Sequence, residues 1–362
     1  MDILYSNMQY KKILVTGGAG FVGSSVCIKL KENYPAITVI ALDNLMRRGS
    51  ELNLPRLKKY GIKFMHGDVR NREDLVVDGL DLLIECSAEP SVMAGVSSSP
   101  DYLLNTNLVG AVNCFELARK TNADIIFLST SRVYPIKRLN DLQFIEEETR
   151  FTIKAKQKIS GAGREGINEE FPLHGARSLY GTTKLAAELI LQEYRENYGI
   201  KAVINRFGVI TGPWQMGKVD QGVIVLWMAR HIFEKPLAYI GFGGKGKQVR
   251  DMLHVDDVFG VLDLQIQKLK DFDGEIYNIG GGLKNSVSLF ELTKLCQKIS
   301  EKNISIKAVA QDRPGDILSY ITDNSKFTKQ TGWKPKISVE QTCGQIHKWI
   351  TGNRDILQQV LE

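Results

Sequence analysis

Residues 12–23 read KILVTGGAGFVG, and this stretch decides the fold. Its first five residues form a short apolar run typical of a buried strand, and the glycines at 17 and 18 end that run. From residue 19 to residue 32, apolar side chains recur at helical spacing. The stretch therefore predicts a strand, a glycine turn and a helix in direct succession.

The same alternation continues along the first half of the chain. Further apolar runs predict buried strands at residues 37–42, 62–64, 80–86, 124–128 and 201–205. Helical patterns lie between them, and the clearest cover residues 101–120 and 178–198. Apolar strands that alternate with helices predict an α/β fold of the Rossmann type, a doubly wound parallel sheet covered on both faces.

The glycines of the first turn, Gly17, Gly20 and Gly23, have the spacing that a dinucleotide requires. They permit a tight turn and a close approach of the backbone to a pyrophosphate, at the positive end of a helix. Asp43 ends the next predicted strand, where a carboxylate hydrogen-bonds ribose hydroxyls and repels a 2′-phosphate. We therefore expect NAD as the cofactor. Arg47 and Arg48 follow closely and leave NADP as an alternative, unless they form a loosely held, solvated pair.

The chain divides at about residue 205. We assign residues 1–205 to an NAD-binding Rossmann domain, completed by a returning segment near residues 250–278. Residues 206–362, richer in glycine and proline, are assigned mainly to a smaller α/β substrate-binding domain over the carboxyl ends of the strands. Between the two, residues 135–175 are long and polar, which is typical of a functional loop or a disordered segment.

Composition limits the classes of partner. The net charge of +6 comes from 47 basic and 41 acidic residues without a dense basic tract, so we expect no nucleic-acid partner. The polar N-terminus and the lack of long apolar runs predict neither a signal peptide nor a membrane span. Five widely spaced cysteines predict free thiols, no metal site and a cytoplasmic location.

Tyr180 and Lys184 stand four residues apart on a predicted helix, so they share one helical face. A nearby ammonium stabilises a phenolate, so we expect the pKa of Tyr180 to be lowered and its oxygen to accept a proton from a sugar hydroxyl. Ser129, Thr130 and Ser131 end a predicted strand and offer a hydroxyl at the same edge of the sheet. Taken alone, Tyr180 and Lys184 would also fit an exposed pair on a helix face. The three hydroxyl side chains would also fit a cap on the segment that follows.

The complete set of motifs resembles the extended short-chain dehydrogenase/reductases, the family of nucleotide-sugar epimerases and dehydratases. The resemblance spans nearly the whole chain and rests on TGGAGFVG (16–23), DN (43–44), GDV (67–69), Asn107, STSRVY (129–134), YGTTK (180–184), the block at 250–257 and TGWKP (331–335). Longer strings are similar to a branch that acts at C2 of a CDP-sugar: DNLMRRGS (43–50), AEPSV (88–92), FPLHGARSLYG (171–181), GPWQMGKVDQG (212–222) and GKQVRDMLHVDD (246–257).

The resemblance implies roles for individual residues. The catalytic residues would be Thr130, Tyr180 and Lys184. Tyr180 and Lys184 would also contact NAD. Eleven further residues would contact it as well: Gly17, Gly20, Phe21, Val22, Asp43, Asn44, Asp68, Val69, Ser87, Asn107 and Phe207. Substrate contacts would come from Glu89, Ser91, Thr130, Gln215, Arg250 and Arg313, with the two arginines directed at the diphosphate and the nucleotide ribose, a role that suits a guanidinium.

Two departures from the family pattern narrow the reaction. Dehydratases of the family carry an acidic pair directly after the catalytic hydroxyl, but here the residues are Ser131 and Arg132. Many 4-epimerases have asparagine where this chain has Val209. The resemblance therefore implies an epimerase of a CDP-sugar that works by transient oxidation at C2, in a homodimer or homotetramer. The alternatives are a 4-epimerase of a UDP- or GDP-sugar and a catalytically silent NAD-binding regulatory protein.

Overall fold

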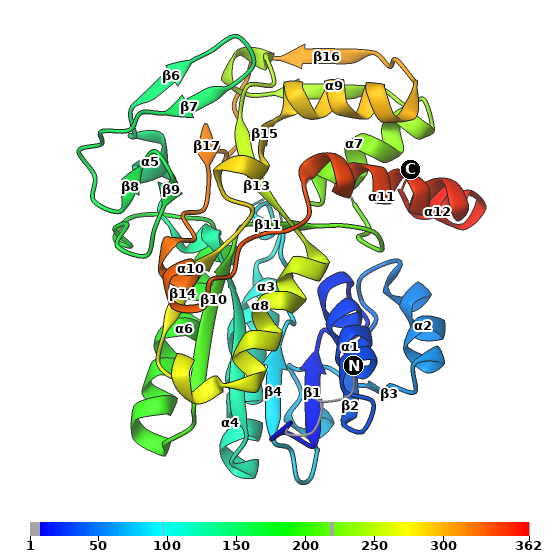
Figure 1. The fold of residues 1–362 in the computed structure, drawn as a ribbon, viewed down its shortest axis with the longest axis vertical. Coiled ribbons are helices and arrows are strands. Elements are labelled where there is room, and N and C mark those ends of the chain that lie inside the picture. The colour runs from blue at the N-terminus through cyan, green and yellow to red at the C-terminus, as the bar shows by residue number, and fades with distance from the viewer. Residues whose placement is uncertain (1–7, 97, 218–220, 362) are drawn as a thin grey trace.

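The computed structural model describes residues 8–96, 98–217 and 221–361. The polar residues 1–7 and residues 218–220 of the GPWQMGKVDQG string lie outside this part of the chain. Figure 1 shows two lobes, a larger one that contains the N-terminus and a smaller one that contains the C-terminal helices, with several chain crossings between them.

A seven-stranded sheet forms the centre of the larger lobe, in the order β14-β10-β5-β4-β1-β2-β3. Every neighbouring pair in it is parallel. Its strands are β1 (Lys12–Thr16), β2 (Thr38–Asp43), β3 (Lys63–His66), β4 (Leu82–Glu85), β5 (Asp124–Thr130), β10 (Ala202–Phe207) and β14 (Ile276–Ile279). The Rossmann-type doubly wound sheet expected from the sequence is confirmed.

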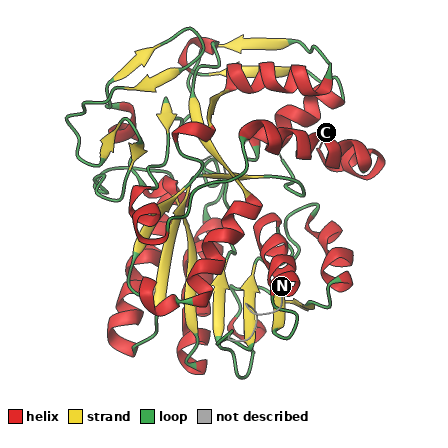
Figure 2. Ribbon diagram, viewed as in Figure 1, coloured by secondary structure: helices red, strands yellow, loops and turns green. Residues whose placement is uncertain are grey.

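Helices cover both faces of this sheet (Figure 2). On one face α1 (Phe21–Asn33) packs with α8 (Val255–Gln267), and α2 (Leu54–Lys59) lies beside α1. On the other face α4 (Gly110–Thr121) packs against α6 (Leu179–Tyr198). The two faces bury separate apolar cores, one around Val26 and Val258 and the other around Phe115 and Leu191. This arrangement holds the carboxyl ends of the strands toward the smaller lobe.

The helix predicted at residues 101–120 is not uniform. It consists of α3 (Asp101–Leu104), a π-helical turn over Asn105–Val109, and α4. The wider turn lets the buried Asn107 side chain accept a hydrogen bond from the Glu89 backbone N (2.7 Å) and donate one to the Glu89 backbone O (3.0 Å). The π-helical turn therefore holds the Glu89 backbone, in the loop after β4, in place.

Residues 135–175 are ordered, so the disordered alternative is wrong. They form α5 (Ile136–Asn140), the hairpin of β6 (Phe144–Glu146) and β7 (Phe151–Ile153), and the short pair β8 (Ala162–Gly163) and β9 (Gly166–Ile167). Tyr134, Leu139, Phe171 and Tyr320 share a small apolar core beneath them. The polar composition hid this core, because only a few apolar side chains in the segment are needed to fill it.

The smaller lobe contains a second sheet and most of the remaining helices. The sheet joins β11 (Val209–Thr211), β13 (Val249–His254), β15 (Ser286–Ser288) and β17 (Ser319–Tyr320), while β12 (Leu237–Ile240) pairs with β16 (Ile306–Val309). Its helices are α7 (Val223–Ile232), α9 (Leu289–Ser300), α11 (Val339–Gly352) and α12 (Arg354–Leu361). The chain returns to the larger lobe with α8 and β14, and again with α10 (Ser325–Thr331), whose Phe327 joins the α1–α8 core.

Among the described residues, no helix combines the length and apolar character that crossing a membrane requires. All five cysteines are free thiols, as the sequence predicted.

Candidate active site

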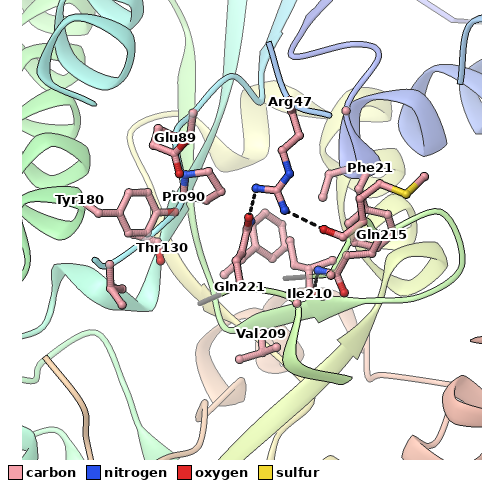
Figure 3. A pocket seen from close by; sticks show the side chains of 18 of the residues that line it. Phe21, Arg47, Glu89, Pro90, Thr130, Tyr180, Val209, Ile210, Gln215 and Gln221 are labelled. Atoms are coloured by element: carbon pink, nitrogen blue, oxygen red, sulfur yellow. Dashed lines mark hydrogen bonds between the residues drawn. The ribbon is translucent and has the colours of Figure 1, made fainter. Parts of the chain in front are cut away.

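A cavity of about 930 Å³ lies between the two lobes, at the carboxyl ends of β1, β4, β5 and β10. Residues from the glycine turn, the β2 and β4 loops, α6 and the smaller lobe line its wall. Open α/β sheets bind ligands at this edge. Figure 3 shows Tyr180, Thr130 and Glu89 on one side of the cavity, with Phe21 and Gln215 on the other.

The glycine turn has the geometry that a pyrophosphate site needs. Gly17 has a φ of +61°, and a Cβ at Gly23 would stand 2.2 Å from the Gly17 carbonyl oxygen, so neither position tolerates a side chain. Gly20 caps α1 without a side-chain hydrogen bond, and the first turn of α1 holds no acid. The amides at this helix end therefore remain available to a phosphate, and the cradle fits NAD.

Asp43 lies beside this turn and its carboxylate is held by two backbone amides. It accepts hydrogen bonds from the N–H of Ala19 (3.1 Å) and the N–H of Leu45 (2.8 Å). Burial raises the pKa of Asp43, and these hydrogen bonds oppose the shift. The carboxylate thus ties the glycine turn to the end of β2 and faces the cavity.

Replacing Asp43 with asparagine is expected to weaken NAD binding about tenfold, because a charge-assisted hydrogen bond to ribose is lost. Since burial raises the pKa of Asp43, the wild-type affinity should fall as the pH is lowered, and D43N should remove that dependence. Calorimetric titration of the cofactor-free proteins with NAD and with NADP, over a series of pH values, measures both effects. Equal NAD affinity in both proteins would contradict the role of Asp43.

Of the two arginines behind Asp43, Arg47 is half-buried and firmly held, whereas Arg48 is exposed to solvent. Arg47 donates a hydrogen bond to the Met216 carbonyl oxygen (2.7 Å). It also donates to the Gln221 side chain, as Figure 3 shows. Arg48 donates to the Gln359 carbonyl oxygen. Both guanidinium groups therefore bind the smaller lobe and connect the β2 loop to it.

Asn44 and Asp68, both expected from the sequence to contact NAD, contact each other. The Asn44 amide donates to the Asp68 carboxylate (2.9 Å), and Arg70 forms an ion pair with that carboxylate (2.6 Å). The hydrogen bonds from Arg70 lower the pKa of Asp68 to about 2. Asn44 and Val69 line the cavity, whereas Asp68 does not and instead accepts the hydrogen bond from Asn44.

The start of α6 places Tyr180. The hydroxyl of Ser178 caps the helix by accepting the N–H of Gly181 (3.1 Å). A Cβ at Gly181 would stand 2.0 Å from the Arg132 carbonyl oxygen, so only glycine lets the helix end approach the turn after β5 this closely. That approach brings Tyr180 close to Thr130, on the same side of the cavity. Tyr180, Thr130 and Lys184 all line the cavity.

The expected lowering of the pKa of Tyr180 is not found. Burial raises this pKa, while the neighbouring Thr130 side chain and the positive charge of Arg132 oppose the shift. Burial is the main reason for the raised pKa of Tyr180. A smaller contribution comes from Glu85, whose buried carboxylate pairs with the Lys184 ammonium at 3.4 Å and itself raises the pKa of Tyr180.

Most of the predicted ligand contacts meet in the cavity. Besides the residues already described, its wall includes Phe21, Val22, Ser87, Glu89, Phe207, Gln215, Arg250 and Arg313. Arg250 forms an ion pair with Asp316 at 3.0 Å. Ser91 and Asn107 lie behind the wall and are buried, with the Ser91 hydroxyl accepting the N–H of Met93 (3.2 Å).

The sequence did not reveal the roles of two acidic residues, Glu85 and Asp316, or that the basic residue Arg132 would act on Tyr180. Glu85 ends a run of buried apolar residues, and a charge in such a strand was the signal that could have revealed it. Asp316 pairs with Arg250 from a distant loop, which no local pattern indicates. Arg132 lines the cavity beside Arg250, and its positive charge acts on Tyr180. Within the described parts of the chain, His, Cys, Asp and Glu form no cluster that could hold a metal ion.

The sheet, the glycine turn and the cavity together define a Rossmann-type dinucleotide-binding protein with a ligand-binding lobe over the strand ends. A family model described as the NAD dependent epimerase/dehydratase family matches residues 13–280, and the chain belongs to this family. It is therefore an enzyme whose cofactor is NAD, and the resemblance inferred from the motifs is confirmed.

The similarity to known members extends over almost the entire chain. CDP-paratose 2-epimerase of Salmonella typhi is 30% identical over 352 residues, which cover 93% of this chain and 98% of that protein. UDP-glucose 4-epimerase of Thermotoga maritima, solved with UDP-glucose, is 26% identical with a TM-score of 0.76 and covers 95% and 99% of the two chains. The Thermus thermophilus UDP-glucose 4-epimerase, solved with NAD, has a TM-score of 0.74 and 26% identity, covering 94% and 99%.

Proposed function

We propose that this enzyme is a nucleotide-sugar epimerase that inverts C2 of a CDP-sugar, with CDP-paratose as the leading substrate. The observation that carries the proposal is the pair Ser131 and Arg132, which line the cavity next to Tyr180. Neither side chain can supply the acid needed to eliminate water from a sugar. The reaction that remains is oxidation of the sugar followed by its reduction. The similarity to CDP-paratose 2-epimerase supports C2 as the carbon that is oxidised.

The side chains of the cavity suggest how the reaction proceeds. When bound, NAD supplies a group that accepts a hydride and returns it. Tyr180 takes the proton of the C2 hydroxyl as hydride leaves the same carbon, and gives it back after the sugar presents its other face. Thr130 and Arg132 favour the phenolate form of Tyr180. Arg250 and Arg313 offer guanidinium groups for the diphosphate.

A 4-epimerase of a UDP-sugar is the second candidate, because the structural similarity includes UDP-glucose 4-epimerases. Val209 argues against it: its half-buried side chain lines the cavity and cannot hydrogen-bond a ligand. Competition binding with CDP, UDP and GDP separates the two proposals. CDP should bind most tightly, and a preference for UDP would favour the 4-epimerase.

Incubation with CDP-paratose in deuterium oxide tests the reaction itself. Return of the same hydride predicts conversion to the C2 epimer without deuterium at C2, because that hydrogen never exchanges with solvent. Deuterium at C2 would instead show proton abstraction from carbon. A protein that binds NAD and CDP-paratose without converting it would be the catalytically silent alternative. Nucleotides released by denaturing the purified protein show whether NAD stays bound between turnovers.

A homodimer or homotetramer stays a prediction. Exposed apolar side chains on the outer helices, such as Val109 (44% exposed) and Leu189 (56% exposed), would suit such an assembly. Sedimentation of the purified protein measures it.

A further inference from the structure

Beneath the cavity, the ammonium of Lys184 lies between two fixed groups. On one side it lies 4.0 Å from the centroid of the Phe127 ring on β5. On the other it lies 3.4 Å from Oε2 of Glu85, the last residue of β4. The side chains of Lys184 and Glu85 are 2% and 1% exposed. A buried charge of this kind persists only when it is paired.

The Glu85 carboxylate is held in place by its own contacts. Oε1 accepts hydrogen bonds from the backbone N–H of Ser87 (3.0 Å) and from the Ser87 hydroxyl. The parallel register of β1 and β4 places Thr16 opposite Glu85, with the Thr16 hydroxyl at 3.5 Å from Oε1. The sheet therefore fixes this carboxylate independently of any ligand.

We infer that Glu85 is a positioning residue of the active site, whose buried carboxylate keeps the Lys184 ammonium charged and in place. The inference rests on the proposed function only in taking Lys184 as a site residue. An ammonium carries three N–H donors, and one directed at Glu85 leaves two for a group bound in the cavity. Without Glu85, burial would favour the neutral amine, which has fewer donors and no charge.

Other titratable groups surround this pair and must be controlled in any test. Tyr180 lies on the same helix, and the remaining groups come from the β4 loop, from α4 and from the turn after β5: Cys86, Glu89, Cys114 and Arg132. Tyr180 matters most, because a phenolate could replace the missing carboxylate. The comparison is therefore made in a Y180F background.

Acylation tests the inference, since acetic anhydride reacts only with the neutral amine. Y180F and Y180F/E85Q are labelled over a pH series, and mass spectrometry quantifies the peptide that contains Lys184. Half-labelling should occur at a lower pH in Y180F/E85Q. Y180F/E89Q is the matched control, because the Glu89 carboxylate lines the same cavity but hydrogen-bonds the N–H of Ser91 (3.1 Å), and it should change the profile less than Y180F/E85Q does.

An unchanged profile in Y180F/E85Q, or an equal change in Y180F/E89Q, overturns the inference. If Y180F/E85Q does not fold, Y180F/E85D takes its place, because the shorter side chain keeps the charge but withdraws it from the ammonium, which lies 3.4 Å from Oε2 of Glu85. A smaller change in the same direction is expected there, and no change contradicts the inference. Because labelling requires no substrate, failure of the inference about Glu85 can be distinguished from failure of the proposed epimerisation.

Discussion

Replacing Tyr180 with phenylalanine is expected to lower kcat by about 100- to 10,000-fold, because the group that exchanges a proton with the sugar is removed. The phenyl ring fills the same space, and the Ser178 cap and Gly181 contact that position the helix end are unaffected. NAD content and the unfolding midpoint should therefore stay close to those of the wild type. Steady-state turnover of CDP-paratose, together with the NAD released on denaturation, measures these effects.

Tyr198 provides the matched control for this substitution. It lies at the end of the same helix, is 53% exposed, and is remote from the cavity wall. Y198F should retain full turnover. A Y180F enzyme that kept more than about a tenth of the wild-type kcat would show that another group moves the proton.

Replacing Glu188 with glutamine is expected to lower the free energy of unfolding by about 3–5 kcal/mol. The Arg206 guanidinium donates to both oxygens of the Glu188 carboxylate, with the closest contact at 2.7 Å, and the two side chains are 3% and 0% exposed. The Ser129 hydroxyl donates to the same carboxylate. The substitution leaves a buried guanidinium without its counter-charge. Urea unfolding, monitored by circular dichroism, measures the loss.

The same helix offers an exposed pair for comparison. Glu196 contacts Arg195 but is 69% exposed, so E196Q should change the free energy of unfolding by less than about 1 kcal/mol. The double variant E188L/R206M should regain part of the E188Q loss, because apolar side chains can replace a buried ion pair. An E188Q loss no larger than that of E196Q would show that water or another group compensates Arg206.

The strands were predictable from the sequence because a parallel sheet buries both faces and leaves continuous apolar runs. β1 covers the residues expected, and β5 extends two residues further, to Thr130. The second sheet was not predicted in detail, because its strands β11, β15 and β17 have only two or three residues each. Runs that short have no periodicity, and their pairing depends on contacts between distant parts of the chain.

The candidate site was predictable where a motif fixes the backbone, as at Gly17, Gly23 and Gly181. It was not predictable where charges meet across the fold. The sequence shows Lys184 four residues after Tyr180, but Glu85 lies 99 residues earlier and reaches the ammonium only through the sheet. The expectation that Lys184 would lower the pKa of Tyr180 therefore had the wrong direction, because it took account neither of burial nor of the Glu85 carboxylate.

The position of β14 at the edge of the large sheet has a consequence for biosynthesis. During translation, β10 is complete at residue 207, but its partner on one side is not synthesised until residues 276–279. A nascent chain of intermediate length thus carries a strand with an open row of backbone donors and acceptors, a template for pairing with other chains. Ribosome-bound chains should engage chaperones during this interval and lose them once β14 has emerged.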